Sequence, residues 1–329
     1  MVRTGSSTYL QYGKEGSFSG GATATRVFGL QQKFTGITWK NNQIPLTQLN
    51  NIEVASFAYG KNEGSGSVEF VMSNPWIFDI MLDGVDKSGT TNDYSYIWSS
   101  DKSALIADNT DINTPNSVHI EYGFDAETQS VTRNMKGALV NSFNLKSTIN
   151  ETVKCSTELL WGLEDAIDTT YTAGTVTDGV EFPYTFAHAE LLSPTSGSTV
   201  AQIQDFDITF STNSELLYTL NSPNAAGGFR KIFEMTGKFK AAMVDKSELQ
   251  KVIDRTESAT LKVTLTNGLS TTNEKSITLE FTGVGVSEHT TDTSPGEPVF
   301  ENLSFQMRSV NVTANNSINK TLTSEFMTD

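Results

Sequence analysis

Histidine and cysteine, two residue types that often bind metals or take part in catalysis, are scarce in this sequence. Its three histidines, His119, His188 and His289, lie in separate segments, and it has a single cysteine. No His-x-x-x-His or Cys-x-x-Cys spacing brings ligands together as a zinc site requires. No Gly-x-Ser-x-Gly element stands between a strand and a helix to present a nucleophilic serine. The sequence therefore predicts no catalytic centre, no metal site and no cofactor.

Two other features resemble chemical sites but have simpler explanations. The stretch DNTDIN (108–113) brings oxygen ligands close together. It lacks the glycine and the terminal glutamate of a calcium loop, so we interpret it as a solvated loop. Cys155 lies in a run that alternates apolar and polar residues, which is typical of a small core residue rather than a reactive thiol.

The charge of the chain excludes another class of function. The formal net charge is −15 at neutral pH. Such a surface repels phosphate backbones and anionic lipids, so we expect neither conventional nucleic-acid binding nor a membrane partner. One small basic cluster is predicted either to pair with carboxylates of a neighbouring subunit or to be solvated, and it consists of Arg230, Lys231, Lys238 and Lys240.

The elements that must hold these side chains are mostly strands. The 329 residues are 37% hydrophobic, rich in Thr, Ser, Asn, Gly and Phe, and include only eight prolines. A chain of this length suggests two domains. Its first ten residues lack the apolar run of about 7–15 residues that marks a signal peptide, and none is expected.

Alternating patterns predict strands in the first half. The runs at 49–60 and 65–73 are predicted to form a hairpin through a Gly- and Asn-rich turn. Ser73 is predicted to cap a short helix, whose core-facing residues are Ile77, Ile80 and Met81. Polar residues 83–116 are predicted to form a long loop. Further strands are expected at 117–124, 137–148 and 152–162.

The second half repeats this arrangement. The runs at 201–212 and 214–222 are predicted to form a hairpin, and a strand at 231–244 leads to a helix capped by Asp245. The helical anchors Leu249, Val252 and Ile253 follow those of the first half at one constant offset, which is also the offset between Asp245 and Ser73. The simplest explanation is a duplicated β-domain with one helix packed on each sheet, although strand–cap–helix units also recur by chance.

The order of these features resembles the two-domain tail tube proteins of tailed bacterial and archaeal viruses. The resemblance covers nearly the whole chain, and the stretches that carry it are YGKEGSFSGG (12–21), MKGALVNSFNLKSTINETVKCSTELLWG (135–162), VAQIQDFDITFSTNSELLYTLNS (200–222), EMTGKFKAAMVDKSELQKVI (234–253) and SITLEFTGVGV (276–286). These are packing patterns rather than chemical signatures.

The resemblance implies a fold and a function. The fold is mainly β, with two tandem β-sandwich or barrel-like tail-tube modules, each with one short flanking α-helix. The chain would form trimers with pseudo-six-fold symmetry, and stacked rings would make the hollow tail tube. Expected partners are further copies of the chain, the tape measure, tail terminator and baseplate proteins, and viral DNA that passes through without specific binding. The protein would be assembled in the host cytoplasm and reside in the virion.

Patterns and resemblance together divide the chain. The segments are an N-terminal arm 1–35, a first tube module 36–165 with the long loop 83–116, a linker 166–182, a second tube module 183–313, and a C-terminal tail 314–329. The arm is expected to be irregular and to dock through its aromatic side chains. The arm, the long loop, the linker and the tail are candidates for contacts along the tube axis.

Strand alternation also suggests which carboxylates line the lumen. Fixed negative charges repel phosphate and would let DNA slide along the wall. The candidates are Glu53, Glu63, Glu69, Asp205 and Asp207. The alternative is that these are ordinary carboxylates of the outer surface.

Three other functions stay open at the level of sequence. A tail terminator or baseplate hub protein could share the fold, but it would form a single ring. A carbohydrate-binding or adhesive β-sandwich would expose aromatic side chains on a concave face. A hydrolase would need a convergent set of titratable side chains, of which the sequence offers few.

Overall fold

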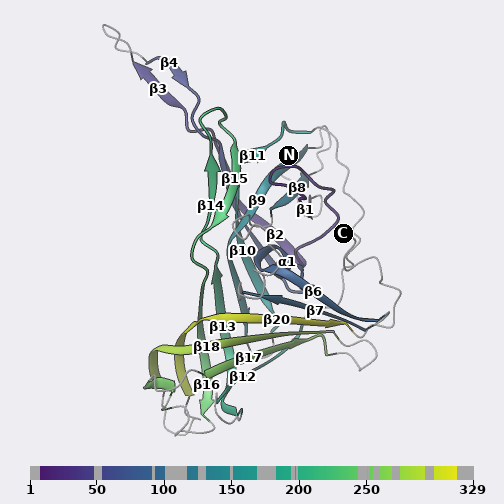
Figure 1. Cartoon of the computed structure of the whole chain (residues 1–329), viewed down its shortest axis with the longest axis vertical. Helices are drawn as coiled ribbons and strands as arrows, with labels where there is room; N and C mark the ends of the chain where they lie inside the picture. Colours follow the sequence, from purple (N-terminus) through teal and green to yellow (C-terminus); the bar gives the residue numbers. More distant parts are fainter. Residues whose placement is uncertain are drawn as a thin grey trace.

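The chain is almost entirely β, as the computed structural model shows (Figure 1). The structure describes residues 8–47, 54–90, 93–100, 117–124, 131–148, 151–168, 183–193, 197, 199–243, 250, 252–254, 259–268, 275–292 and 300–316. Within these ranges one short helix that is described in full, α1 (Trp76–Met81), accompanies the strands.

Each half of the chain consists mainly of antiparallel strands. The strands of the first half are β1 (Thr8–Lys14), β2 (Leu30–Lys40), β3 (Ile44–Thr47), β4 (Val54–Ala58), β5 (Glu63–Val71), β6 (Asp83–Thr90), β7 (Asp93–Ser99), β8 (Val118–Phe124), β9 (Val131–Ser147), β10 (Lys154–Trp161) and β11 (Leu163–Glu164). Those of the second half are β12 (Phe186–Leu192), β13 (Thr199–Ser211), β14 (Ser214–Tyr218), β15 (Ala225–Arg230), β16 (Glu234–Met243), β17 (Ala259–Thr266), β18 (Lys275–Asp292), β19 (Phe300–Met307) and β20 (Ser309–Asn316).

Period-2 alternation explains why these segments are strands. In β17 every second residue is buried, beginning with Ala259 and Leu261, and the residues between them are half-buried. Successive side chains of a strand point to opposite faces, so such a segment covers the core with one face. Alternation thus predicted many strands of the core, such as β8, β10 and β13, but it missed β1, β2 and β12.

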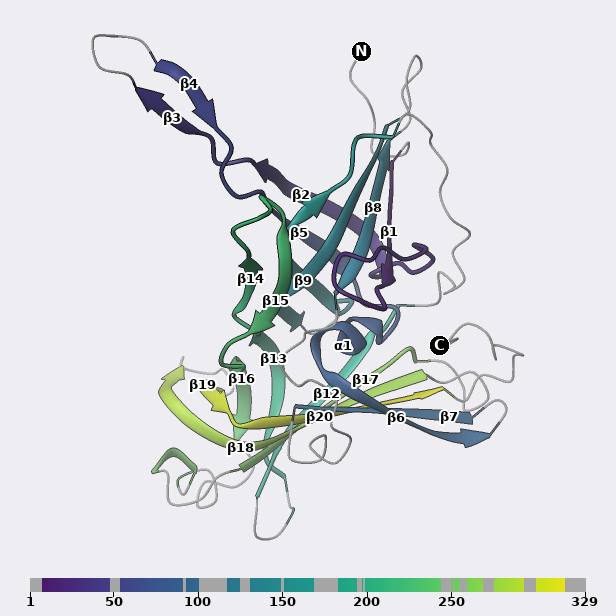
Figure 2. The ribbon, with the colours of Figure 1, turned by 45° about the horizontal axis from the view of Figure 1, so that its top comes forward.

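Six strands of the second half close into an antiparallel barrel. The pairings run from β12 to β17, β18, β19, β16 and β13, and β13 pairs again with β12. A closed barrel leaves no unpaired strand edge where the ring of hydrogen bonds is complete. In Figures 1 and 2 this barrel forms the lower part of the molecule.

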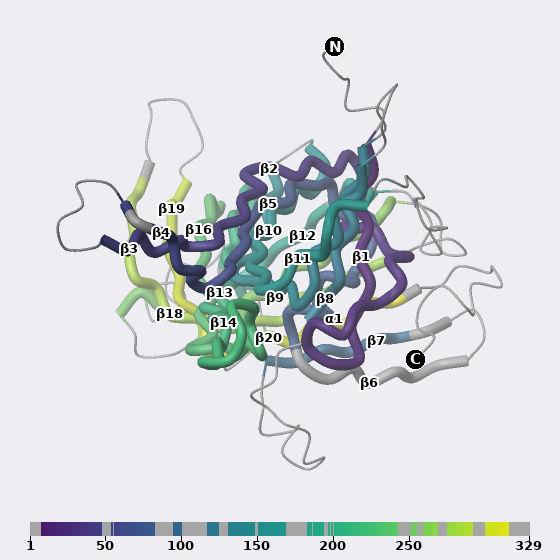
Figure 3. The backbone as a smooth tube through the Cα atoms, turned by 90° about the horizontal axis from the view of Figure 1, so that it is seen from above, coloured from purple at the N-terminus to yellow at the C-terminus, as the bar shows by residue number. Residues whose placement is uncertain are grey.

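Six strands of the first half follow one another in a comparable series. β1 pairs with β8, β8 with β9, β9 with β10, β10 with β5, and β5 with β2. Figure 3, seen from above, shows β2, β5 and β10 side by side. No strand pairing between β1 and β2 closes this series within the described part of the chain; one bridge, between Tyr12 and Arg26, lies near the gap.

Among the described residues, strand pairing joins the two halves at two places. β9 pairs with β13 of the second half, and the hairpin of β6 and β7 adds to the second half through β20. Buried hydrophobic side chains of both halves form one cluster. In that cluster the ring of Phe78 on α1 lies 5.8 Å from Phe143 of β9 and 6.4 Å from Phe210 of β13.

The predicted cap of the first helix is wrong, although the helix and its buried face are confirmed. Asn74, not Ser73, supplies the side-chain acceptor, since its Oδ1 accepts the Trp76 N–H at 3.2 Å. Ile77, Ile80 and Met81 are buried as expected. In the second half Gln250, Val252 and Ile253 are helical, but the predicted cap Asp245 and the anchor Leu249 lie outside the described residues.

Two predictions of pairing and one prediction of a loop are wrong for the same reason. The run at 49–60 does not pair with the run at 65–73, because β4 pairs with β3 and β5 pairs with β2. Likewise β14 pairs with β15 rather than with β13. The first part of the predicted loop 83–116 is the β6–β7 hairpin. Each of these segments is locally plausible as a strand or a loop, and its partner is set by tertiary structure.

The N-terminal arm is more regular than expected. It contains β1, which pairs along its whole length with β8, and the first residues of β2. Its aromatics Tyr12 and Phe28 are buried with ring centroids 4.5 Å apart, so the arm docks through aromatic side chains as predicted. Most of the predicted linker (166–182) and C-terminal tail (314–329) lies outside the described residues.

Candidate functional site

An eight-strand sheet runs through both halves of the molecule. Its order is β2, β5, β10, β9, β13, β16, β19, β18. One face of this sheet packs on the core, and we call the other the open face. On β10, for example, Leu159 and Trp161 are fully buried, while Lys154 and Glu158 are exposed on the open face.

The open face carries charges of both signs. On β16, Lys238 and Lys240 stand directly opposite Asp207 and Asp205 of β13. Lys146 of β9 stands on the other side of Asp207. Opposite charges at directly paired positions stabilise antiparallel strands by about 0.2–1 kcal/mol each. The acids of β13 are therefore matched by lysines rather than forming a uniformly acidic wall.

The predicted lumen carboxylates on β5 are also matched by lysines. Glu63 lies 2.7 Å from Lys61, and this hydrogen bond lowers the pKa of the Glu63 carboxyl. Glu69 lies 3.5 Å from Lys33 of β2, and both side chains are exposed. Four of the five predicted acids thus lie on one face, and the fifth, Glu53, is outside the described residues.

The predicted basic cluster is not brought together. Arg230, at the end of β15, donates from Nη2 to the carbonyl oxygen of Ile80 in α1 at 2.9 Å. Lys231 pairs with Glu215 of β14. The two other lysines lie on β16, on the open face. The cluster was predicted because its four residues are close in sequence. In the structure, β15 belongs to a hairpin that projects from the sheet, whereas β16 lies within the sheet.

The eight-strand sheet ends in two strand edges. β2 pairs with β5 alone, and residues 285–292 of β18 pair with β19 alone, among the strands that the structure describes. An edge strand presents a row of main-chain N–H and C=O groups that can pair with another chain. These two edges are the places where the sheet can be extended.

Inside the chain, the two halves of this sheet meet at a well-packed joint. We call the pairing of residues 142–147 with residues 206–211 the internal joint. On its core face, Phe143 and Phe210 stand opposite each other with ring centroids 5.7 Å apart. On its open face, the Asn144 amide donates to Thr209 Oγ1 at 3.0 Å and also to Asp207.

Two hairpins project from the sheet near the same end. The β3–β4 hairpin extends away from the body of the molecule, and the β14–β15 hairpin rises beside it (Figure 1). Large apolar side chains on and beside these hairpins are exposed: Ile44, Leu46, Val54, Phe57, Tyr59, Leu217, Leu220 and Ile232. Exposed apolar side chains that gather on projecting elements mark an interaction surface.

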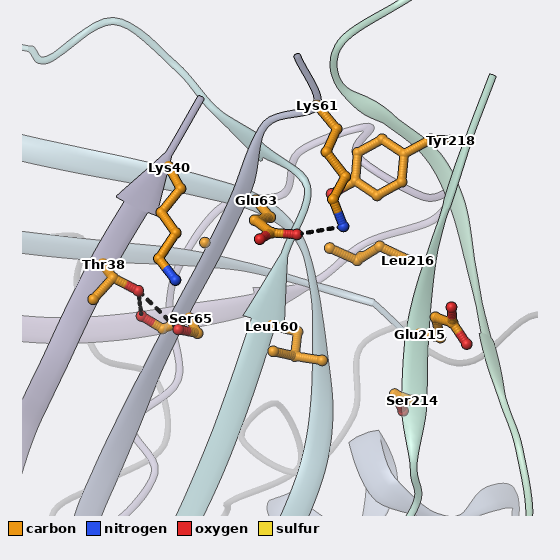
Figure 4. A pocket seen from close by; sticks show the side chains of 11 residues that line it. Thr38, Lys40, Lys61, Glu63, Ser65, Leu160, Ser214, Glu215, Leu216 and Tyr218 are labelled. Carbon is orange, nitrogen blue, oxygen red and sulfur yellow. Dashed lines mark hydrogen bonds and ion pairs between the residues drawn. The ribbon is translucent and has the colours of Figure 1, made fainter. Parts of the chain in front are cut away.

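A cleft of about 350 Å³ lies at the base of these hairpins (Figure 4). Lys61 lies 5.4 Å from the ring centroid of Tyr218 and bridges it to Glu63. Burial and the nearby Glu63 carboxylate raise the pKa of Tyr218 to about 12. The described lining residues include no histidine and no cysteine.

Sequence reasoning missed one residue of structural importance, Glu15. Its buried carboxylate accepts the hydroxyl of Ser117 at 2.6 Å and the backbone N–H groups of Ser19, Gly21 and Gly137 at 3.1 Å. The stretch at 12–21 carried part of the family resemblance, but nothing in it identifies donors more than a hundred residues away.

The described residues contain no group of three or more His, Cys, Asp and Glu side chains arranged to hold a metal ion. Within the same residues, none of the helical structure is long and apolar enough to cross a lipid bilayer.

Comparison with known proteins agrees with this geometry. A family model described as "Phage tail tube protein" matches residues 5–314. A search of curated proteins finds no match to the chain.

Proposed function

The chain belongs to the phage tail tube protein family, and from that membership we propose that it forms closed rings of three chains through a duplicated tube module. The protein is a structural component of the phage tail in the virion and has no enzymatic role. The number of chains in a ring, the duplication and the contacts described below are our proposals. The observation that carries them is a second copy of the strand order of the first half.

The pairing order of six strands supports the duplication. The series β1, β8, β9, β10, β5, β2 of the first half corresponds, strand by strand, to β12, β17, β18, β19, β16, β13 of the second. The second series closes into a barrel, and the first has the same neighbours. Five strand pairings in the same order are far more specific than a recurring strand–cap–helix unit.

Single residues in the longest strands of the two halves support it further. Gly137 in β9 and Gly283 in β18 have φ values of 64° and 65°, and each stands where its strand changes partner. Four positions further along, Asn141 and Ser287 each form a one-residue bulge. The glycines and the bulges are therefore separated by the same offset in sequence.

The lengths of the projecting hairpins agree as well. Residues 41–62 connect β2 to β5, and residues 212–233 connect β13 to β16, so the two connections are equally long. The helical residues near 250–254 follow β16 as α1 follows β5. We therefore propose two tube modules with boundaries near 36–165 and 183–313, and β1 belongs with the first.

Ring formation follows from the open ends of the eight-strand sheet. The internal joint already connects the first module of a chain to the second, and the same connection between chains would close a ring. Three chains supply 24 strands to such a ring. At a spacing of about 4.8 Å, that many strands enclose a backbone ring at least about 37 Å across, before strand tilt widens it.

We propose that the open face lines the lumen of this ring. Its paired lysines and carboxylates offer viral DNA no continuous basic surface, so the duplex passes without specific binding. Glu63, Glu69, Asp205 and Asp207 are then lumen residues, as the sequence suggested. Lys238 and Lys240 belong to the same wall rather than to a separate basic contact with a neighbour.

The exposed apolar side chains of the two hairpins support stacking of ring on ring. Both hairpins leave the sheet at the same end, so that a ring of three chains would present six of them along its axis. The terminal and loop segments named from the sequence are further candidates for this role. At the tube ends, the tape measure, tail terminator and baseplate proteins are the expected partners.

Negative-stain electron microscopy of the concentrated purified protein tests this function. We expect hollow filaments of uniform width, with shorter stacks at lower concentration. Single rings that never elongate would point instead to a terminator-like role. A protein that remains monomeric at all concentrations would contradict the proposal.

A further inference from the structure

We propose that the contact between chains pairs residues 35–40 of β2, which include a one-residue bulge between Thr35 and Thr38, with residues 288–292 of β18 in a second copy, in the antiparallel register of the internal joint. The inference rests on the proposed function, since it specifies the contact that closes the ring. The partner of both edge strands, β2 and β18, is another copy of this chain. The register, that is, which residue of one strand stands opposite which residue of the other, follows from the strand pairings inside the single chain.

The register on β18 follows from its equivalence to β9. Val140 stands opposite Leu159 in the first half, and its equivalent Val286 stands opposite Phe305 in the second. Both strands then have their bulge, and pairing resumes at Ser142 and at Glu288. The segment of β9 in the internal joint begins at Ser142, so the corresponding segment of β18 begins at Glu288.

The register on β2 follows from its pairing with β5. In the second half, Ser211 of β13 stands opposite Glu234, the first residue of β16. In the first half, Lys40 stands opposite Glu63, the first residue of β5. Lys40 therefore corresponds to Ser211, which is the partner of Ser142 in the internal joint.

Combining the two registers gives the pairs between chains. Glu288 stands opposite Lys40, His289 opposite Trp39, and Thr290 opposite Thr38. The first pair places a carboxylate beside an ammonium group at one end of the contact.

The side chains fit this pairing on the open face. Lys40 and Glu288 are exposed, and no salt bridge joins either to a described residue, although the charge of Lys40 contributes to lowering the pKa of the Glu63 carboxyl. Figure 4 shows Lys40 with no interaction drawn to its ammonium group. In the internal joint, Lys146 and Asp207 are likewise of opposite charge and directly paired. Opposite charges favour this register over one in which like charges meet.

The core-facing side chains fit as well. His289 and Trp39 correspond to Phe143 and Phe210, the two rings that stack across the internal joint. Trp39 is only half-buried in the single chain, and His289 is held at 2.7 Å from Glu301. A second chain at this edge would cover the indole and give the main-chain groups of both strands their partners.

Charge reversal tests the pair directly. We expect Lys40→Glu and Glu288→Lys each to lower the yield of filaments at least about tenfold, and the double variant to restore most of it. Lys154→Glu is the matched control, because it makes the same change of charge on the open face away from either edge. Loss in the single variants without recovery in the double variant would overturn the proposed pair.

Cross-linking gives a second, independent readout. Cysteines at Lys40 and Glu288 of the same chain should form disulfides between chains under mild oxidation, giving a ladder that stops at three chains on a non-reducing gel. The native Cys155 is buried and burial raises its pKa, so it does not compete. Cysteines at Lys40 and Asn302, one strand further along, are the control and should not cross-link.

The two tests separate the contact from the function. If filaments of the cysteine variant form but yield no disulfide, the register is wrong and the tube function stands. If the largest cross-linked species contains a number of chains other than three, the contact stands and the three-chain ring is wrong. If the wild-type protein never assembles, the proposed function itself fails.

Discussion

At the scale of single residues, one buried carboxylate holds distant parts of the first half together. Glu15 is 7% exposed and accepts hydrogen bonds from a turn of the N-terminal segment, from Ser117 and from Gly137 in the longest strand of its half. Backbone N–H groups left without an acceptor in the interior cost about 1–3 kcal/mol each. The conformation around Gly137 therefore depends on this one side chain.

Glu15→Ala should lower the free energy of unfolding by about 2–4 kcal/mol, because it leaves several donors without a partner. Glu15→Gln should cost less, since one carbonyl oxygen remains to accept. Urea denaturation followed by circular dichroism measures both. Glu234→Ala, at an exposed position on β16, is the control and should change stability by less than about 0.5 kcal/mol. Equal stability of Glu15→Ala and the wild type would refute the role of this carboxylate.

The sequence predicts the sheet face on which a residue lies wherever the alternation of a strand alone determines that face. It placed Glu63, Glu69, Asp205 and Asp207 on one kind of strand face, and the structure brings all four to the open face. It did not find their lysine partners, since all of these except Lys61, the neighbour of Glu63, come from other strands that are distant in sequence. Glu15 was missed for the same reason.

At the scale of elements, the longest strands share a device for changing partner. β9 pairs first with β8 and then with β10, and β18 pairs first with β17 and then with β19. At each change a glycine adopts a positive φ, which other residues adopt only with strain. In this way β18 can belong both to the six-strand barrel and to the eight-strand sheet.

Replacing these glycines tests their equivalence. Gly137→Ala and Gly283→Ala should each destabilise the protein by about 1–3 kcal/mol, because alanine is strained in this conformation and its Cβ would lie 2.4 Å from Ser19 Oγ or 2.7 Å from Arg308 Cβ. Gly285→Ala is the matched control on the same strand as Gly283, since its Cβ would meet no atom within 4 Å. Thermal unfolding measures all three. A variant at Gly137 or Gly283 as stable as Gly285→Ala would contradict the assignment.

The sequence predicted most of the strands but not their pairing. The same mistake occurred twice, at β4 and at β14, where a run of alternating residues was joined to its neighbour in sequence. Both runs belong to projecting hairpins whose apolar residues are exposed in the single chain, so their pattern imitates that of a core strand. Both errors fall in the projecting hairpins, which lie between β2 and β5 and between β13 and β16.

At the scale of the whole molecule, the two halves are interlocked rather than merely tethered. Main-chain pairing joins β9 to β13 and β7 to β20, and one hydrophobic cluster spans both. The constant offset between the two predicted helices was visible in the sequence. The interlocking was not, because it depends on strand edges whose partners no local pattern specifies. Among the described strands this interlocked unit has two edges without a partner, which suits it to closing a ring with further copies.

Cryo-electron microscopy of the assembled filaments tests the central claim most directly. We predict three chains in each ring, a wall sheet that continues from β18 of one chain into β2 of the next, and six nearly equivalent modules around a hollow centre. A ring whose wall is interrupted at these two strands, or a filament in which each chain closes its own sheet, would contradict the account.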